Sequence, residues 1–86
     1  MGKPMYDVFI LCEWTYTTIF AQHLRELLRG QEEQVEVLNH GMTNKQGIGF
    51  VLLTWKGNVP QSFLGQLFHN QEVLDFAVYS IGNSPT

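Results

Sequence analysis

The sequence predicts one small α+β domain whose elements follow the order β-α-β-β-α-β. Four strand-like stretches alternate with two stretches that have helical periodicity, and no linker or repeat divides the chain. Its 86 residues are 44% hydrophobic and 13% aromatic, which favours a folded core over disorder. The two central strands are apolar on both faces, so the sheet is expected to bury more than one side.

The first strand is expected at Tyr6–Cys12, where β-branched and aromatic residues dominate a run too short for a buried helix. Side-chain oxygens of Thr15, Thr17 and Thr18 then offer a cap for the first helix. Gly30 supplies the left-handed conformation that commonly ends a helix. The expected buried stripe of this helix consists of Phe20, Leu24, Leu27 and Leu28.

The second and third strands are expected to pair as an antiparallel hairpin. Gln34–Asn39 alternates polar and apolar residues, and Ile48–Trp55 is almost entirely apolar. A short turn from Gly41 to Gly47 joins them, which favours antiparallel pairing of neighbours.

The second helix begins after Asn58, which is expected to cap it, with Pro60 in its first turn. Gly65 weakens this helix unless it allows close approach to the sheet, and Asn70 ends it. Val73–Ile81 forms the last expected strand. The expected buried stripe of the second helix consists of Phe63, Leu64, Leu67 and Phe68.

Two β-α-β units with right-handed crossovers give a four-stranded antiparallel sheet with both helices on one face. This arrangement is the ferredoxin-like fold. We expect residues 1–86 to form a single domain with an ordered core of about residues 5–82. Met1–Pro4 and Gly82–Thr86 are expected to be short flexible tails, because they contain Gly, Pro, Ser and Asn.

Strand alternation divides the central residues between a face under the helices and an open face. Because Gly49 would let a helix approach closely, Gly49, Val51 and Leu53 are assigned to the helix side. The expected open face is apolar, and we interpret it as an interaction surface for a homodimer or a protein partner. Alternatives are cover by a tail or a tilted helix, a register shifted by one residue, and a bound ligand or nucleic acid. The open face consists of Phe9, Leu11, Ile48, Phe50 and Leu52.

The composition argues against several classes of function. Net charge is −3 with five Lys or Arg residues, whereas nucleic-acid binders are usually basic. Cys12 is the single cysteine, so no intramolecular disulfide forms, which fits a cytoplasmic protein. The apolar runs are far shorter than the ~20 residues that a membrane span needs.

Groups that could carry catalysis are scattered, and we expect a non-catalytic protein without cofactor or metal. Cys12 is predicted on the helix-facing side as an inert buried thiol. His23, His40 and His69 fall in three separate elements without the spacing of metal ligands. An acidic patch, expected to be solvated, consists of Glu32, Glu33 and Glu36.

Two segments resemble the RNA recognition motif, a family with the same β-α-β-β-α-β fold. Gln46–Leu53 follows the family's third-strand octapeptide at its second, fourth, fifth and sixth positions. Val8–Glu13 follows its first-strand hexapeptide at the first three positions. The resemblance implies that Phe9 and Phe50 stack on bases of single-stranded RNA and that Lys45 meets phosphate.

This resemblance has two departures. Ile48 stands where the family has an aromatic ring, and Gln46 stands where it has Lys or Arg. RNA binding is therefore an alternative to protein binding. A second alternative, by analogy of fold, is a small-molecule-binding regulatory module of the amino-acid-binding type. The first strand–helix loop, Cys12–Thr17, lacks the glycine that such modules typically use.

Overall fold

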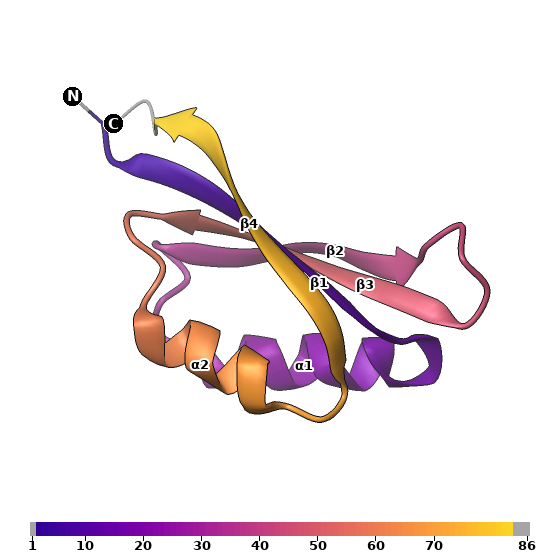
Figure 1. Ribbon diagram of the computed structural model, residues 1–86. Coiled ribbons are helices and arrows are strands. Elements are labelled where there is room, and N and C mark those ends of the chain that lie inside the picture. The colour runs from indigo at the N-terminus through magenta and orange to yellow at the C-terminus, as the bar shows by residue number, and fades with distance from the viewer. Residues whose placement is uncertain (1, 84–86) are drawn as a thin grey trace.

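A computed structural model of the protein describes residues 2–83. Its four strands form one antiparallel sheet in the order β2-β3-β1-β4, and both helices lie on one side of it (Figure 1). The predicted ferredoxin-like α+β fold is thereby confirmed. The elements are β1 (Pro4–Glu13), a 3-10 turn (Trp14–Tyr16), α1 (Thr17–Leu27), β2 (Val35–Met42), β3 (Ile48–Lys56), α2 (Gln61–His69) and β4 (Val73–Asn83).

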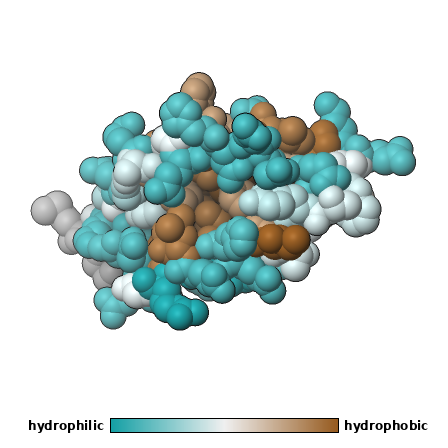
Figure 2. All heavy atoms as spheres, turned by 90° about the horizontal axis from the view of Figure 1, so that it is seen from below, coloured by the Kyte–Doolittle hydropathy of each residue, from teal (hydrophilic) through white to brown (hydrophobic). Residues whose placement is uncertain are grey.

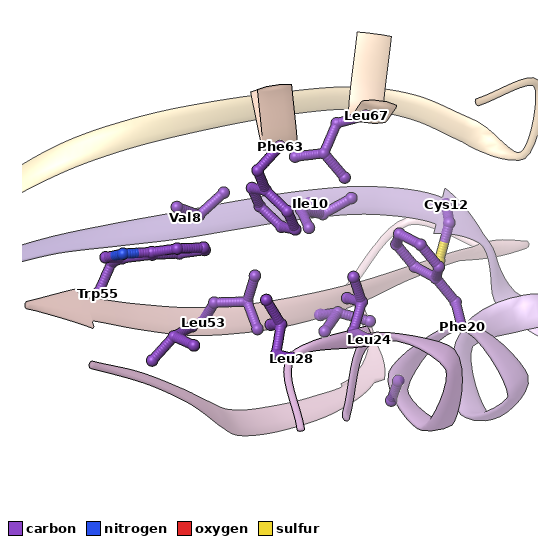
Figure 3. Packing of buried hydrophobic residues seen from close by; sticks show 13 residues of the cluster. Val8, Ile10, Cys12, Phe20, Leu24, Leu28, Leu53, Trp55, Phe63 and Leu67 are labelled. Carbon is purple, nitrogen blue, oxygen red and sulfur yellow. The ribbon is translucent and has the colours of Figure 1, made fainter. Parts of the chain in front are cut away.

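The core lies between the sheet and the helices. Alternate residues of β1 and β3 are almost fully buried there, because their side chains share the helix-facing side of the pleat. Phe63 of α2 points toward the sheet above Ile10 and packs against Trp55, with ring centroids 5.0 Å apart (Figure 3). The buried hydrophobic residues are Val8, Ile10, Cys12, Phe20, Ala21, Leu24, Leu28, Val35, Val51, Leu53, Trp55, Phe63 and Leu67.

Gly49 allows the first turn of α1 to approach the sheet closely. A Cβ built on Gly49 would overlap Oγ1 of Thr17 and lie only 3.0 Å from the carbonyl oxygen of Gly41. Thr17 is itself buried, and its Oγ1 lies 3.5 Å from Sγ of Cys12. The close approach expected from this glycine is therefore present.

The predicted threonine caps of α1 are wrong. The chain enters the helix through the 3-10 turn, and its N-cap residue is Tyr16, which makes no side-chain cap hydrogen bond. The hydroxyls of Thr17 and Thr15 instead donate to the backbone carbonyl and the carboxylate of Glu13. Thr18 is exposed on the first turn of the helix.

Three expectations for the helices also need correction. Pro60, and not Asn58, is the N-cap residue of α2, and it caps with its backbone carbonyl alone, which accepts from the amides of Phe63 and Leu64. Leu27 is 52% exposed and Phe68 is 76% exposed, so neither belongs to the buried stripe. The stripes are narrower than predicted because each helix buries only the side chains that face the sheet directly.

The first and last strands of the chain are longer than the sequence analysis predicted. Pro4, Gly82 and Asn83, which were assigned to the tails, belong to β1 and β4, and Pro4 pairs with Asn83. The β1–β4 ladder runs beyond the ends of the helices (Figure 1), so residues 78–83 are exposed. Met1 and residues 84–86 of the predicted tails lie outside the described residues.

Candidate functional site: the open face of the sheet

The side of the sheet opposite the helices carries a continuous apolar patch on its two central strands. In the register of β1 and β3, Phe9 pairs with Leu52, and Leu11 pairs with Phe50. Ile48 follows on the same side at the end of β3. All these side chains are half-buried because they cover one another, and they lie on the predicted face. We call this set the open-face patch: Phe9, Leu11, Ile48, Phe50 and Leu52.

A pair of stacked aromatic rings forms the centre of the open-face patch. The ring centroids of Phe9 and Phe50 are 5.5 Å apart, with an angle of 15° between the ring planes. The Phe50 ring also lies over Gly41 of β2, where a Cβ would be 3.5 Å from its edge. Stacking adds about 0.5–1.5 kcal/mol beyond area burial, so the two rings hold each other in place. The patch is therefore a pre-formed apolar surface.

One end of the patch is bounded by a polar row that crosses the sheet. The hydroxyl of Thr54 donates to the Asp7 carboxylate over 2.8 Å. In the strand register, Thr54 pairs with Glu36 of β2, and Asp7 pairs with Tyr79 of β4. This row separates the apolar residues from the far end of the sheet.

Two further carboxylates border the other end of the patch. Asp75 of β4 pairs with Leu11, and Glu13 at the end of β1 pairs with Ile48, so both stand on the open side by register. Asp75, Glu13 and Glu36 are exposed. We call the four carboxylates around the patch the acidic rim: Asp7, Glu13, Glu36 and Asp75.

The nearest lysines stand farther away along the strands. Lys56 lies on the same side of β3 but two positions beyond Thr54, and it pairs with Met5. Lys45 is exposed in the turn that precedes Ile48. The immediate border of the open-face patch is consequently negative.

The three residues that the resemblance to the RNA recognition motif assigns to RNA contact do not all lie together. Phe9 and Phe50 lie side by side, whereas Lys45 occupies the β2–β3 turn, where its amide donates to the Thr43 hydroxyl over 3.1 Å. Their role toward RNA stays a prediction.

Within the part of the chain that the structure describes, Cys12 and the histidines, which carry nucleophilic or metal chemistry in other proteins, are not gathered into one site. Cys12 is fully buried on the helix side, as predicted, and burial raises the pKa of its thiol above the ordinary 9.0, with Glu13 and Glu72 adding to the rise and the Thr17 hydrogen bond opposing it. His23 and His69 are exposed on different helices. Residues 2–83 contain no cluster of three potential metal ligands, and within that range no helix has the length and apolarity to cross a membrane.

Sequence reasoning missed three recesses away from the open-face patch. A groove of about 670 Å³ lies at the edge of the sheet, between the end of α1 and β2, and is lined by Arg25, Arg29, Glu26 and Glu32 together with Glu36, which register also places in the acidic rim. Hydrogen bonds from the Gly30 and Glu32 backbone amides, together with the charge of Arg29, lower the pKa of the Glu32 carboxyl. The charge of Arg29 therefore already acts on Glu32 within the chain.

Two smaller recesses, of about 150 and 130 Å³, lie between α1 and α2. Leu27 and Phe63 line both recesses, and Figure 2, which views the helix side, shows apolar atoms in the hollow between polar borders. The sequence gives no signal for them, because Leu27 is predicted in the buried stripe and its 52% exposure appears only in the structure.

Comparison with known proteins identifies a structural neighbour and no family. No protein-family model and no curated protein sequence matches the chain. Among solved structures, it is similar to the solution structure of the C-terminal domain of the MgtC protein from Mycobacterium tuberculosis. The TM-score is 0.59 at 13% sequence identity, over 92% of this chain and 88% of that chain. At this identity, the similarity shows the fold alone.

Proposed function

We propose that the protein is a non-catalytic binding module that docks another polypeptide through the open-face patch. The observation that carries the proposal is the stacked Phe9–Phe50 pair at the centre of an apolar surface with a polar border, which neither helix of residues 2–83 covers (Figure 1). Interfaces between proteins have this anatomy, with an apolar centre rich in aromatic residues and a polar rim. Both helices pack on the opposite side of the sheet, so they leave this surface free (Figure 1).

The size of the patch favours reversible docking. An apolar patch of about 300 Å², which is common on single domains, would remove about 600 Å² from water when a matching surface covers it. At about 25 cal/mol per Å² the gross gain is roughly 15 kcal/mol, while association costs about 4–15 kcal/mol. The balance supports a weak or transient complex of the smaller interface class.

The RNA-binding alternative has one observation in its favour, which is the aromatic pair itself. Bases stack on such rings, but phosphate contacts supply most of the affinity in complexes with nucleic acids. Here the chain has a net charge of −3, and carboxylates surround the rings. Docking of a polypeptide is therefore the better supported function.

The proposal is tested by locating where a neutral hydrophobic probe binds. We expect Nile red to shift the amide NMR signals of Phe9, Leu11 and Phe50 in the wild-type protein. Phe50→Asp should abolish these shifts, because it places a charge in the apolar centre, and Gln22→Asp should leave them unchanged, because Gln22 is exposed on α1.

Circular dichroism of both variants checks that the fold is retained. If Phe50→Asp does not fold, Leu11→Glu serves as the second patch variant. Probe binding that maps to the grooves between the helices in the wild-type protein would contradict the proposal.

A further inference from the structure

We propose that the partner docked by the open-face patch is a cationic amphipathic helix. This inference rests on the proposed function and specifies the chemistry of the partner. Its basis is the combination of the shape of the open-face patch with the acidic rim around it. An amphipathic helix docks through its one apolar face, so the surface must match that face in width, length and charge.

The width of the patch fits one helix. Its apolar residues come from β1 and β3, which are neighbours in the sheet. Strands lie about 4.8 Å apart, so the two rows of side chains make a stripe roughly 10 Å wide. An α-helix with its side chains has a diameter of about 10–12 Å. A helix lying along the strands would thus cover both rows.

The length of the patch sets the length of the helix. The side chains between the bordering residues Glu13 and Asp7 span six steps along β1, or about 20 Å. An α-helix rises about 1.5 Å per residue, so about 13 residues would span the patch. Apolar residues at i, i+3, i+4 and i+7 would provide the matching face.

The acidic rim determines the charge of the partner. Glu36 and Asp7 stand at one end of the patch, and Asp75 and Glu13 stand at the other. Lys or Arg residues beside the apolar face of the helix would meet these carboxylates at both ends. Such complementarity steers encounter and suppresses wrong partners, because like charges brought together cost free energy.

The same rim disfavours two other occupants. A second copy of the chain stacked face to face would bring two acidic rims together around one interface. The phosphates of RNA would meet the same four carboxylates. A basic helix is the occupant that gains from the rim instead of being repelled by it.

The test is a display selection with a library of amphipathic 14-residue helices. The apolar face is constant, and the flanking positions vary among Lys, Glu, Gln and Ser. We expect the wild-type protein to enrich Lys at the flanks. The double variant Glu36→Lys/Asp75→Lys should enrich Glu, and it should bind the Lys-rich winner at least about tenfold more weakly, since each rim pair contributes about threefold or more.

The matched control is Glu26→Lys/Glu33→Lys, which changes net charge equally at exposed residues of α1 and of the loop that follows it. It should select the same Lys-rich helices as the wild type. If it instead behaves like the rim variant, net charge and not the acidic rim governs binding, and the inference is wrong.

The outcomes separate this inference from the proposed function. If the selected helices show no charge preference at the flanks but still shift the NMR signals of Phe9 and Phe50, the inference of a cationic partner is wrong and the proposed docking through the open-face patch stands. A selection that yields no binder to the patch would overturn both. Sedimentation that shows a second copy seated on the patch, or tighter binding of a short mixed-sequence RNA than of the winning helix, would also overturn the inference.

Discussion

Replacing Gly49 by alanine places a methyl group into the closest contact between α1 and the sheet. The new Cβ would overlap Oγ1 of Thr17, and the carbonyl oxygen of Gly41 at 3.0 Å blocks relief on another side. Because Gly49 and Thr17 are both buried, neither can move into solvent. The first turn of α1 must therefore shift away from β3.

The expected cost follows from the contacts that this shift breaks. Overpacking a close-packed core costs about 1–3 kcal/mol. Thr17 Oγ1 would also lose its contacts with Cys12 Sγ and the Glu13 carbonyl oxygen, both at 3.5 Å, which are long and worth under about 1 kcal/mol together. We expect a loss of about 2–3 kcal/mol from a total free energy of unfolding of about 4–9 kcal/mol.

Urea denaturation measures this loss. For a domain of this size, 2–3 kcal/mol lowers the midpoint by roughly 2 M, and lowers Tm by roughly 10–20 °C. The variant Thr17→Ala removes the hydroxyl that the new methyl would overlap. The double variant should therefore be at least about 1 kcal/mol more stable than the sum of the two single losses predicts.

Two results would refute the reasoning. The first is a loss below about 0.5 kcal/mol for Gly49→Ala, which is the size of an ordinary surface change. The second is additivity of the two substitutions within about 0.5 kcal/mol, because it would mean that the methyl does not meet Thr17.

Three further predictions concern stability and association. Gly65→Ala should raise the free energy of unfolding by about 0.5–1 kcal/mol in urea denaturation, because a Cβ at Gly65 meets nothing within 4 Å and alanine is the better helix former; a loss of stability would contradict the geometry. The pKa of the Cys12 thiol is raised in the folded state, so the thiol loses its proton at higher pH in the folded than in the unfolded chain. The resulting contribution of Cys12 to the free energy of unfolding is fully present below pH about 9 and is lost as pH rises through the folded pKa. The loss of stability at alkaline pH should therefore be smaller in Cys12→Ala, and an identical loss would exclude the thiol as its source. Because two acidic rims would repel each other, the wild-type protein should be a monomer in sedimentation equilibrium at low ionic strength; a dimer that Phe50→Asp dissociates, and that Gln22→Asp on the exposed side of α1 leaves unchanged, would contradict this expectation.

The sequence predicted the order of elements and the two faces of the sheet because strand alternation is a strong local signal. Gly49 was decisive, since it identified the helix side of β3 and thereby the side of Phe50. Caps were predicted from residue type alone, and this failed at Thr17 because its hydroxyl turns back toward Glu13. Whether a threonine caps or packs depends on the entry of the chain into the helix, which is a three-dimensional property.

Half of the acidic rim could not be predicted, because the places of Glu36 and Asp75 depend on register between strands, whereas alternation along β1 already places Asp7 on the side of Phe9 and Leu11. Asp75 borders Leu11 only through the β1–β4 pairing, which includes irregularities next to Met5 and Leu11. A β-bulge at such a point shifts every later side chain by one position relative to the partner strand. Glu36, which the sequence analysis interprets as part of a solvated patch, likewise lies beside Thr54 only because of the β2–β3 register.

The pairing of β1 with β4 also influences how the chain reaches its fold. The β2–β3 hairpin closes a short loop, from Met42 to Gly49, whereas the first β1–β4 contact, from Cys12 to Val73, closes a loop about nine times longer. Because loop-closure entropy grows with loop length, closing the β1–β4 loop costs about 2 kcal/mol more than closing the β2–β3 hairpin. A large share of the contacts of this sheet is therefore non-local, which places its folding rate below that of a helical bundle of equal length.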